Sequence, residues 1–168
     1  MLVVIVIGSP ADEPFARRVA RALDEFAIPW EMRVASAHKT PRHLLDLLAE
    51  YEADPRPRVY VTIAGRSNAL SGLVDAQVAA PVIACPPYSD AFAGGDLLSS
   101  LRVPSGVAPA VVLEPENAAL LAAKMLALDH RELRARIAAA QGAQRRRLVE
   151  ADAALHKSDT NGTDDTDL

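Results

Sequence analysis

The stretch Leu2-Val-Val-Ile-Val-Ile7, which continues into Gly8-Ser9-Pro10, decides the fold. An unbroken apolar run rich in β-branched residues is typical of a strand that is buried on both faces of a parallel sheet. Residues 10–27 then carry apolar side chains at helical spacing. Ser9 can cap this helix, and Pro10 suits its first position. A buried strand that turns directly into a helix predicts the first unit of an α/β fold.

The same alternation of strand and helix patterns continues to residue 128. Further strands are expected at residues 30–35, 58–64, 81–85 and 110–113, and further helices at 40–51, 69–79, 96–101 and 116–128. This order predicts a three-layer α/β fold of the flavodoxin or Rossmann type. Its parallel sheet has about five strands, with helices on both faces. Ligands of such sheets bind outside the carboxyl ends of the strands.

The character of the sequence changes at Asp129, after the α/β domain of residues 1–128. Residues 129–156 form an Ala- and Arg-rich helical pattern with a loose apolar stripe. The five strands already have their helices, so we expect this extension to pack on a neighbouring subunit. Arg145-Arg-Arg147 is interpreted as a solvated face, with an anionic ligand or partner as the alternative. The polar tail of residues 157–168 is expected to be disordered.

Composition narrows the class of protein. The formal charge of −4 argues against a nucleic-acid binder. The single cysteine, Cys85, excludes an internal disulfide framework and a Cys-cluster metal site, and we interpret it as a small core residue. No apolar stretch reaches the ~18 residues of a membrane helix, and the first strand is too short for a signal peptide. We therefore expect a cytoplasmic protein with no membrane partner.

Three short polar segments each follow an expected strand. They are Gly8-Ser9, Ser36-Ala-His-Lys39 and Ala64-Gly-Arg-Ser-Asn68. Parallel strands end at one edge of the sheet, so we expect the segments to meet there. The first segment offers a glycine for close backbone approach and a helix start that attracts phosphate, although a plain capped turn has the same pattern.

The other two segments carry the chemistry. His38 is the one histidine in a small, polar, strand-end setting, and an imidazole can take and return a proton near neutral pH. Lys39 beside it can hold an anion, although both side chains also fit a solvated loop. The residues after Gly65 offer a guanidinium, a hydroxyl and an amide, unless Ser67 or Asn68 only caps the next helix. No spacing suggests a metal site or a serine hydrolase.

Five ordered segments resemble the PurE-type carboxylases of purine biosynthesis. They are Gly8-Ser-Pro-Ala-Asp12, Ser36-Ala-His-Lys39, Ala64-Gly-Arg-Ser-Asn68, Pro81-Val-Ile-Ala-Cys-Pro-Pro87 and Ser99-Ser-Leu-Arg-Val-Pro-Ser-Gly106. The resemblance covers roughly residues 2–128. It implies that the α/β domain of residues 1–128 binds the nucleotide and carries out catalysis. It implies a homo-octamer, which would give the C-terminal helix its partner surface.

The resemblance also implies roles for individual residues. His38 transfers the proton on the imidazole carbon of the substrate. Lys39 and Ser67 lie at the end of the site that holds the nucleotide and CO2. His38 and Lys39 are therefore the expected catalytic residues. The implied substrate-binding residues are Gly8, Ser9, Asp12, Ser36, Gly65, Arg66, Ser67, Asn68, Ser105 and Gly106. The family usually has a serine at position 11, where this chain has Ala11. One hydroxyl contact to the phosphate is therefore missing.

The family has two branches. One carboxylates 5-aminoimidazole ribonucleotide (AIR) directly with CO2 to 4-carboxy-AIR (CAIR), reversibly and without ATP, metal or any other cofactor. The other isomerises N5-carboxy-AIR, and typically carries Ser-Ala-His-Arg and a Gly-rich Ala-His loop. Lys39 and Gly65-Arg-Ser-Asn68 are similar to the direct carboxylase branch.

Three alternatives stay open at this point. The nearest is the N5-carboxy-AIR mutase of the other branch. A more distant one is a PurE-like carboxylase acting on a pyridinium nucleotide, although such proteins carry a long N-terminal region and this chain starts at its first strand. The third is a flavodoxin-like nucleotide-binding module without catalysis.

Overall fold

Strand β1 lies inside a five-stranded parallel sheet of the order β2-β1-β3-β4-β5, as the computed structural model shows for the described residues 1–160. The strands are β1 (Leu2–Ile7), β2 (Trp30–Val34), β3 (Arg58–Ile63), β4 (Val82–Ala84) and β5 (Ala110–Val111). The predicted α/β fold with a parallel sheet is confirmed. β5 is shorter than the expected strand over residues 110–113, because the chain turns toward the next helix at Pro115.

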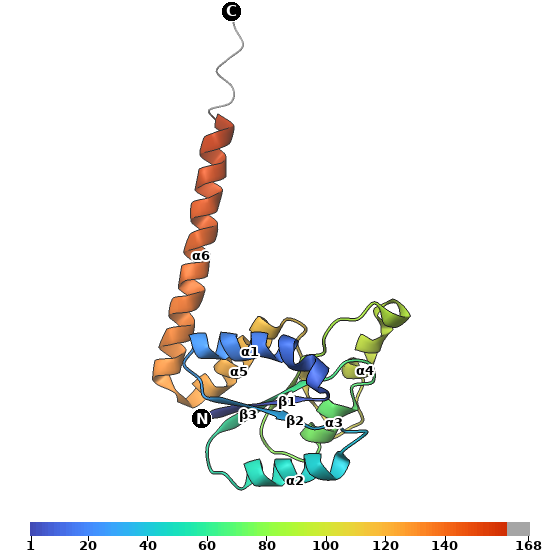
Figure 1. Cartoon of the computed structure of the whole chain (residues 1–168). Helices are drawn as coiled ribbons and strands as arrows, with labels where there is room; N and C mark the ends of the chain where they lie inside the picture. The colour runs from blue at the N-terminus through green and yellow to red at the C-terminus, as the bar shows by residue number, and fades with distance from the viewer. Residues whose placement is uncertain (161–168) are drawn as a thin grey trace, which may run out of the picture.

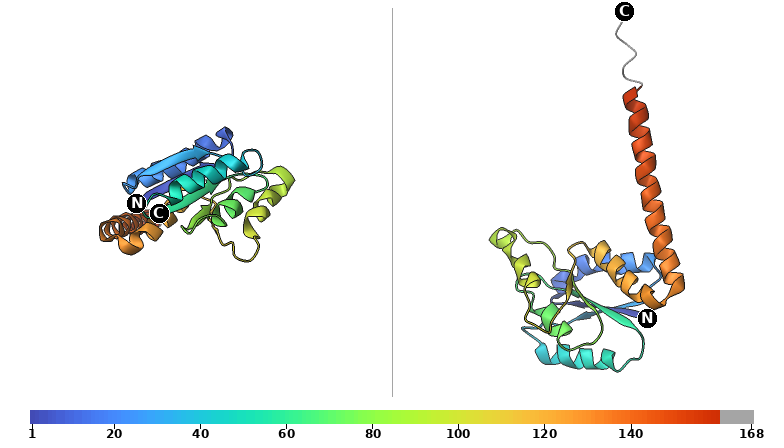
Figure 2. Two further views of the ribbon diagram at one scale, coloured as in Figure 1. Left: turned by 90° about the horizontal axis from the view of Figure 1, so that it is seen from below. Right: turned by 180° about the vertical axis from the view of Figure 1, so that it is seen from behind.

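Helices cover both faces of this sheet (Figure 1). The helices of the described chain are α1 (Glu13–Glu25), α2 (Pro41–Glu52), α3 (Ala69–Asp75), α4 (Leu98–Leu101), α5 (Pro115–Leu126) and α6 (Arg131–Thr160), with 3-10 turns η1 (Pro10–Asp12), η2 (Ala91–Leu97) and η3 (Ala127–Asp129). α1 and α5 lie on one face, and α2 and α3 lie on the other (Figures 1 and 2).

The side chains of β1 show why the apolar run folds as it does. Val3, Ile5 and Ile7 belong to the core on the side of α1 and α5. The alternate residues, including Val4 and Val6, belong to the core on the side of α2 and α3. Each such side chain gains about 1.5–3 kcal/mol from leaving water. A strand with polar residues on either face would lose this gain on one of its two layers.

The strand order creates a crevice at the carboxyl ends of the strands. From β1 the chain crosses to β2 on one side and later returns to β3 on the other side. The connections therefore diverge where β1 and β3 end, at Gly8 and Ala64. This divergence is the place where open parallel sheets bind ligands.

Helix α6 has a different environment from the others. Leu133 and Ile137 near its start are buried beside α5, and the rest projects away from the domain as a rod (Figure 1). The helix continues past residue 156 to Thr160, beyond its expected end. Residues 161–168 of the expected disordered tail lie outside the described residues. Within residues 1–160, no helix combines the length and the apolar character that a membrane crossing needs.

Candidate active site

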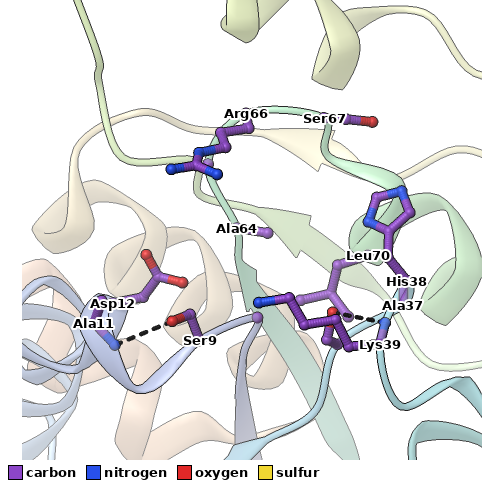
Figure 3. A pocket seen from close by; sticks show the side chains of 13 residues that line it. Ser9, Ala11, Asp12, Ala37, His38, Lys39, Ala64, Arg66, Ser67 and Leu70 are labelled. Atoms are coloured by element: carbon purple, nitrogen blue, oxygen red, sulfur yellow. Dashed lines mark hydrogen bonds between the residues drawn. The ribbon is translucent and has the colours of Figure 1, made fainter.

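A cavity of about 470 Å³ lies at the carboxyl ends of β1, β2 and β3. Its volume is in the range of small-ligand pockets. It is lined by Gly8, Ser9, Ala11, Asp12, Ser36, Ala37, His38, Lys39, Ala64, Gly65, Arg66, Ser67 and Leu70 (Figure 3). The structure thus brings together nine of the polar-loop positions expected from sequence, namely Gly8, Ser9, Asp12, Ser36, His38, Lys39, Gly65, Arg66 and Ser67.

The first loop depends on the close approach of two strand ends. A Cβ atom added to Gly8 would lie only 3.2 Å from the Cβ atom of Ala64. Ser9 caps η1 as predicted, because its Oγ accepts the Ala11 N–H at 3.3 Å. Partial burial raises the pKa of the Asp12 carboxyl from its ordinary value. The cavity therefore has one carboxylate whose charged form is only partly hydrated.

The second loop closes on itself between Ser36 and Thr40. The Ser36 N–H donates to the Thr40 Oγ1 at 2.9 Å, and the Thr40 N–H donates back to the Ser36 carbonyl at 2.9 Å. The Lys39 N–H donates to the Ser36 Oγ at 3.2 Å. Thr40 was expected to open the next helix, and it does so without a side-chain cap, because its hydroxyl is used in this turn. Local bonds therefore present His38 and Lys39.

The third loop is strained and is held from outside. Arg66 has φ of 57°, in the left-handed region, which costs a non-glycine residue about 1–3 kcal/mol. The Ser99 Oγ lies 3.0 Å from the Arg66 carbonyl oxygen and accepts the Asn68 N–H at 2.9 Å. Ser99 belongs to α4, which is far from this loop in sequence. Such strain persists only where surrounding contacts enforce it.

Asn68 lies outside the cavity lining. It was expected among the substrate-binding residues, but it is buried and does not line the cavity. Its Oδ1 accepts the Ser71 N–H at 3.3 Å, and its Nδ2 donates to the Ser100 Oγ at 2.8 Å. The helix-cap interpretation of this position is confirmed. Each end of the amide makes one bond inside the chain, and a contact of Asn68 with the substrate stays a prediction.

Ser105 and Gly106 also do not line the cavity. They lie in the turn before β5, where Gly106 has φ of 84°. The turn is tied to α3, because the Ala108 N–H donates to the Asp75 Oδ2 at 2.7 Å. Their contact with a nucleotide stays a prediction.

The cavity combines cations, a hydroxyl-rich wall and one carboxylate. Figure 3 shows His38 and Lys39 on one side, Ser9 and Asp12 on the opposite side, and Arg66 and Ser67 on the loop that follows β3. The Lys39 side chain extends across the cavity toward Ser9 (Figure 3). Two cations and helix-start backbone groups suit an anionic ligand, and the imidazole can transfer a proton.

Other chemistries have less support in the described residues. Within residues 1–160 there is no group of three or more His, Cys, Asp or Glu side chains that could hold a metal ion. Cys85 is fully buried, as expected of a core residue, and burial raises the pKa of its thiol to about 12. A thiol with that pKa is not a nucleophile at neutral pH.

Ser99 and Ser100 are the residues whose roles the sequence did not reveal. They stood in one of the five family-like segments, but no local pattern connected them to the loop after β3. A serine pair inside a four-residue helix gives no local sign of a contact with a distant loop. The apolar lining by Ala37, Ala64 and Leu70 was also not predicted, because small apolar residues carry no chemical signal.

Comparison with known proteins adds an independent line of evidence. The family model described as AIR carboxylase matches residues 2–147, which extends beyond residues 2–128 into α6. A phosphoribosylaminoimidazole carboxylase of Treponema denticola is 49% identical over 156 residues, covering 93% of this chain and 98% of that protein. One of Archaeoglobus fulgidus is 50% identical over 155 residues, covering 92% and 85%.

A solved structure agrees with these sequence matches. The crystal structure of Treponema denticola PurE superposes with a TM-score of 0.91 at 49% identity. The match covers 92% of this chain and 98% of that chain. The similarity therefore includes the sheet, its helices and most of the C-terminal extension.

Proposed function

Because the chain belongs to the AIR carboxylase family and is an enzyme of purine biosynthesis, we propose that it joins AIR and CO2 directly to form CAIR. The observation that carries this proposal is the convergence of His38, Lys39 and Ser67 on one cavity. The first supplies a proton acceptor, the second a cation and the third a hydroxyl. We place the reaction in the cytoplasm.

The nucleotide occupies the side of the cavity formed by β1 and η1. Ser9 and Asp12 contact it, and the phosphate lies near the first turn, where backbone and cationic groups favour a negative charge. Ala11 offers no hydroxyl at that turn. The Ala11 N–H is already engaged by Ser9, so phosphate binding relies on the remaining backbone groups of this turn.

The chemical step forms one carbon–carbon bond and breaks one carbon–hydrogen bond. The amine of AIR donates electron density to the neighbouring ring carbon, which attacks the CO2 carbon while one C=O electron pair moves to oxygen as carboxylate charge. The ring carbon then carries a proton and a carboxylate. His38 takes the proton, the C–H electron pair restores the aromatic ring, and CAIR results. In reverse, His38 returns the proton and CO2 leaves.

Lys39 and Ser67 act on the charge that develops during this step. CO2 has little affinity for protein groups of its own, so its position depends on a shaped pocket. The ammonium of Lys39 and the hydroxyl of Ser67 stabilise the growing carboxylate. This assignment separates the chain from the mutase branch, whose typical arginine and Ala-His loop differ at these positions.

The enzyme assembles as a homo-octamer in which α6 packs on a neighbouring subunit. Beyond Ile137 this helix keeps Leu148, Val149 and Leu155 exposed in the single chain. An apolar side chain gains about 1.5–3 kcal/mol from burial, which a neighbouring subunit can supply. Multi-angle light scattering of the full chain and of Leu148→Glu tests this assembly, which would be contradicted by a monomeric wild type.

A substrate swap tests the proposed reaction. Purified protein is given AIR with bicarbonate as the CO2 source, and separately N5-carboxy-AIR, and CAIR formation is followed in both. We expect CAIR from AIR in a His38-dependent reaction. Formation of CAIR from N5-carboxy-AIR alone would assign the chain to the mutase branch, and formation from neither would overturn the enzyme assignment.

A further inference from the structure

We propose that Ser99 is a positioning residue that sets the catalytic geometry of Ser67 and Arg66, with Asn68 anchoring the same loop to α4. Neither residue lines the cavity, so each acts through the loop after β3. The proposal rests on the proposed function in one respect, namely that Ser67 and Arg66 serve the reaction.

One hydroxyl group fixes the backbone on both sides of Ser67. The Ser99 Oγ accepts the Asn68 N–H at 2.9 Å and lies 3.0 Å from the Arg66 carbonyl oxygen. Its single proton can be donated either to that carbonyl or to the Asp96 carbonyl at 2.7 Å, while the oxygen accepts from Asn68 in both cases. The two peptide groups that flank Ser67 are thus oriented by one distant atom.

The Asn68 side chain makes the second connection to the same helix. Its Nδ2 donates to the Ser100 Oγ at 2.8 Å, and both residues are buried, with 5% and 2% of their surface exposed. Its Oδ1 holds the first turn of α3 through the Ser71 N–H. Asn68 therefore joins three segments, and Ser99 adds the contact that reaches Arg66.

The conformation of Arg66 explains why the loop needs such a contact. Its φ of 57° is unfavourable for a residue with a Cβ atom, so an unsupported loop would relax toward negative φ. Gly65 before it lies near the Pro87 ring, where an added Cβ would be 3.6 Å from Cγ. That side offers van der Waals contact only. The directional contact that the structure describes for the Arg66 carbonyl comes from Ser99 of α4.

Relaxation of this loop would move the groups that meet CO2. A displacement of about 1 Å at a reacting centre can cost on the order of 10²-fold in rate. Nucleotide contacts at Ser9 and Asp12 come from another strand end and would be unaffected. The contacts that Ser99 and Asn68 make with this loop, here called the α4 clamp, are therefore expected to act on kcat far more than on the KM for the nucleotide.

A double-mutant cycle between Ser99→Ala and Ser67→Ala tests the proposal. Ser99 is exposed, so its replacement should leave the fold intact. We expect Ser99→Ala to lower kcat about 10-fold and to change KM for AIR by less than about 2-fold. In the Ser67→Ala background the same change should lower kcat clearly less than about 10-fold, because one of the two groups that Ser99 positions is gone and only Arg66 remains. Ser99→Thr, which keeps the hydroxyl, should restore most of the rate.

Ser89→Ala is the matched control. Ser89, like Ser99, lies in the segment between β4 and β5. Its Oγ accepts the Ala91 N–H at 3.1 Å and makes no bond to the loop after β3 among the contacts of the described residues. It should keep wild-type kcat. Full activity of Ser99→Ala, or equal losses in the wild-type and Ser67→Ala backgrounds, would overturn the proposal.

A structural readout separates this proposal from the proposed function. If the wild type used only N5-carboxy-AIR, the proposed reaction would fail, but the same cycle could be run with that substrate. If it used neither substrate, the crystal structure of Ser99→Ala would decide. Movement of residues 65–68, with Arg66 leaving the left-handed region, supports the α4 clamp, and an unchanged loop overturns it.

Discussion

The two loops that supply Lys39 and Ser67 to the cavity are held in different ways. The Ser36–Thr40 loop is closed by bonds between residues three or four positions apart. The loop after β3 is held by serines that are 31 to 33 positions away and contains a strained arginine. One loop thus carries its own conformation, and the other takes its conformation from the rest of the fold.

The conformations of the two loops therefore depend on the rest of the fold to different degrees. A loop closed by neighbouring residues keeps its shape wherever its strand ends. A loop that is held by residues far away in the sequence keeps its shape only while those residues stay in place. For the loop after β3 they belong to the segment that contains η2 and α4. The reacting groups from the two loops can then respond differently to mutation, which the following experiments can establish.

The largest effect is expected in the locally closed loop. His38→Asn should lower kcat by about 10³-fold, because a general acid–base group contributes 10²- to 10⁴-fold. Nucleotide binding, measured by isothermal titration, should stay within a few-fold of the wild type. The control is His43→Asn on the exposed face of α2. Wild-type turnover by His38→Asn would remove His38 from the mechanism.

The next effect tests the closure of that loop. Thr40→Val removes the acceptor of the Ser36 N–H and should lower the free energy of unfolding by about 1 kcal/mol. Misplacement of His38 and Lys39 should lower kcat/KM by about 10-fold. Urea unfolding and steady-state kinetics measure the two effects. Thr40→Ser keeps the hydroxyl and should restore both, whereas a silent Thr40→Val would show that the loop holds without this bond.

A smaller effect compares strain inside and outside the site. Ala27 follows α1 with φ of 52°, close to the 57° of Arg66. Ala27→Gly should stabilise the protein by about 0.5–1 kcal/mol, seen as a rise in Tm of about 1–4 °C, with unchanged kcat. Arg66→Gly should relieve similar strain but lower kcat. Equal kcat in both variants would show that the Arg66 conformation does not serve the reaction.

The smallest effect concerns a long-range contact at the surface. Arg18 on α1 donates two bonds of 2.9 Å to Glu116 on α5, and this hydrogen bonding lowers the pKa of Glu116. A lowered pKa adds stability above the ordinary glutamate value of 4.5, and the addition is lost as pH falls through the lowered value.

Glu116→Gln should therefore lower Tm slightly at pH 7, by less than about 2 °C for an exposed pair. The difference from the wild type should vanish in acid, well below pH 4.5. Thermal unfolding followed by circular dichroism at both pH values measures it. A difference that persists in acid would show that the pair's charge is not the cause.

Much of the fold could be predicted from the sequence because its signals are local. The apolar run of β1, the cap at Ser9 and the helical spacing after it each depend on a few adjacent residues. The same holds for His38 and Lys39, whose loop follows a strand and closes on itself. The ends of the elements were less predictable, as the short β5 and the longer α6 show, because tertiary contacts decide where regular structure stops.

The sequence by itself determined the α/β fold, the edge of the sheet that holds the polar loops, and the residue types available for proton transfer and anion binding. Periodicity and strand-end position are local properties of the chain, so they can be recognised without coordinates. Only the tertiary structure decided that Asn68 is a buried anchor, that Arg66 adopts a left-handed conformation, and that Ser99 holds the loop between them. Those features depend on hydrogen bonds between segments about 30 residues apart, and no pattern within one segment encodes such a bond.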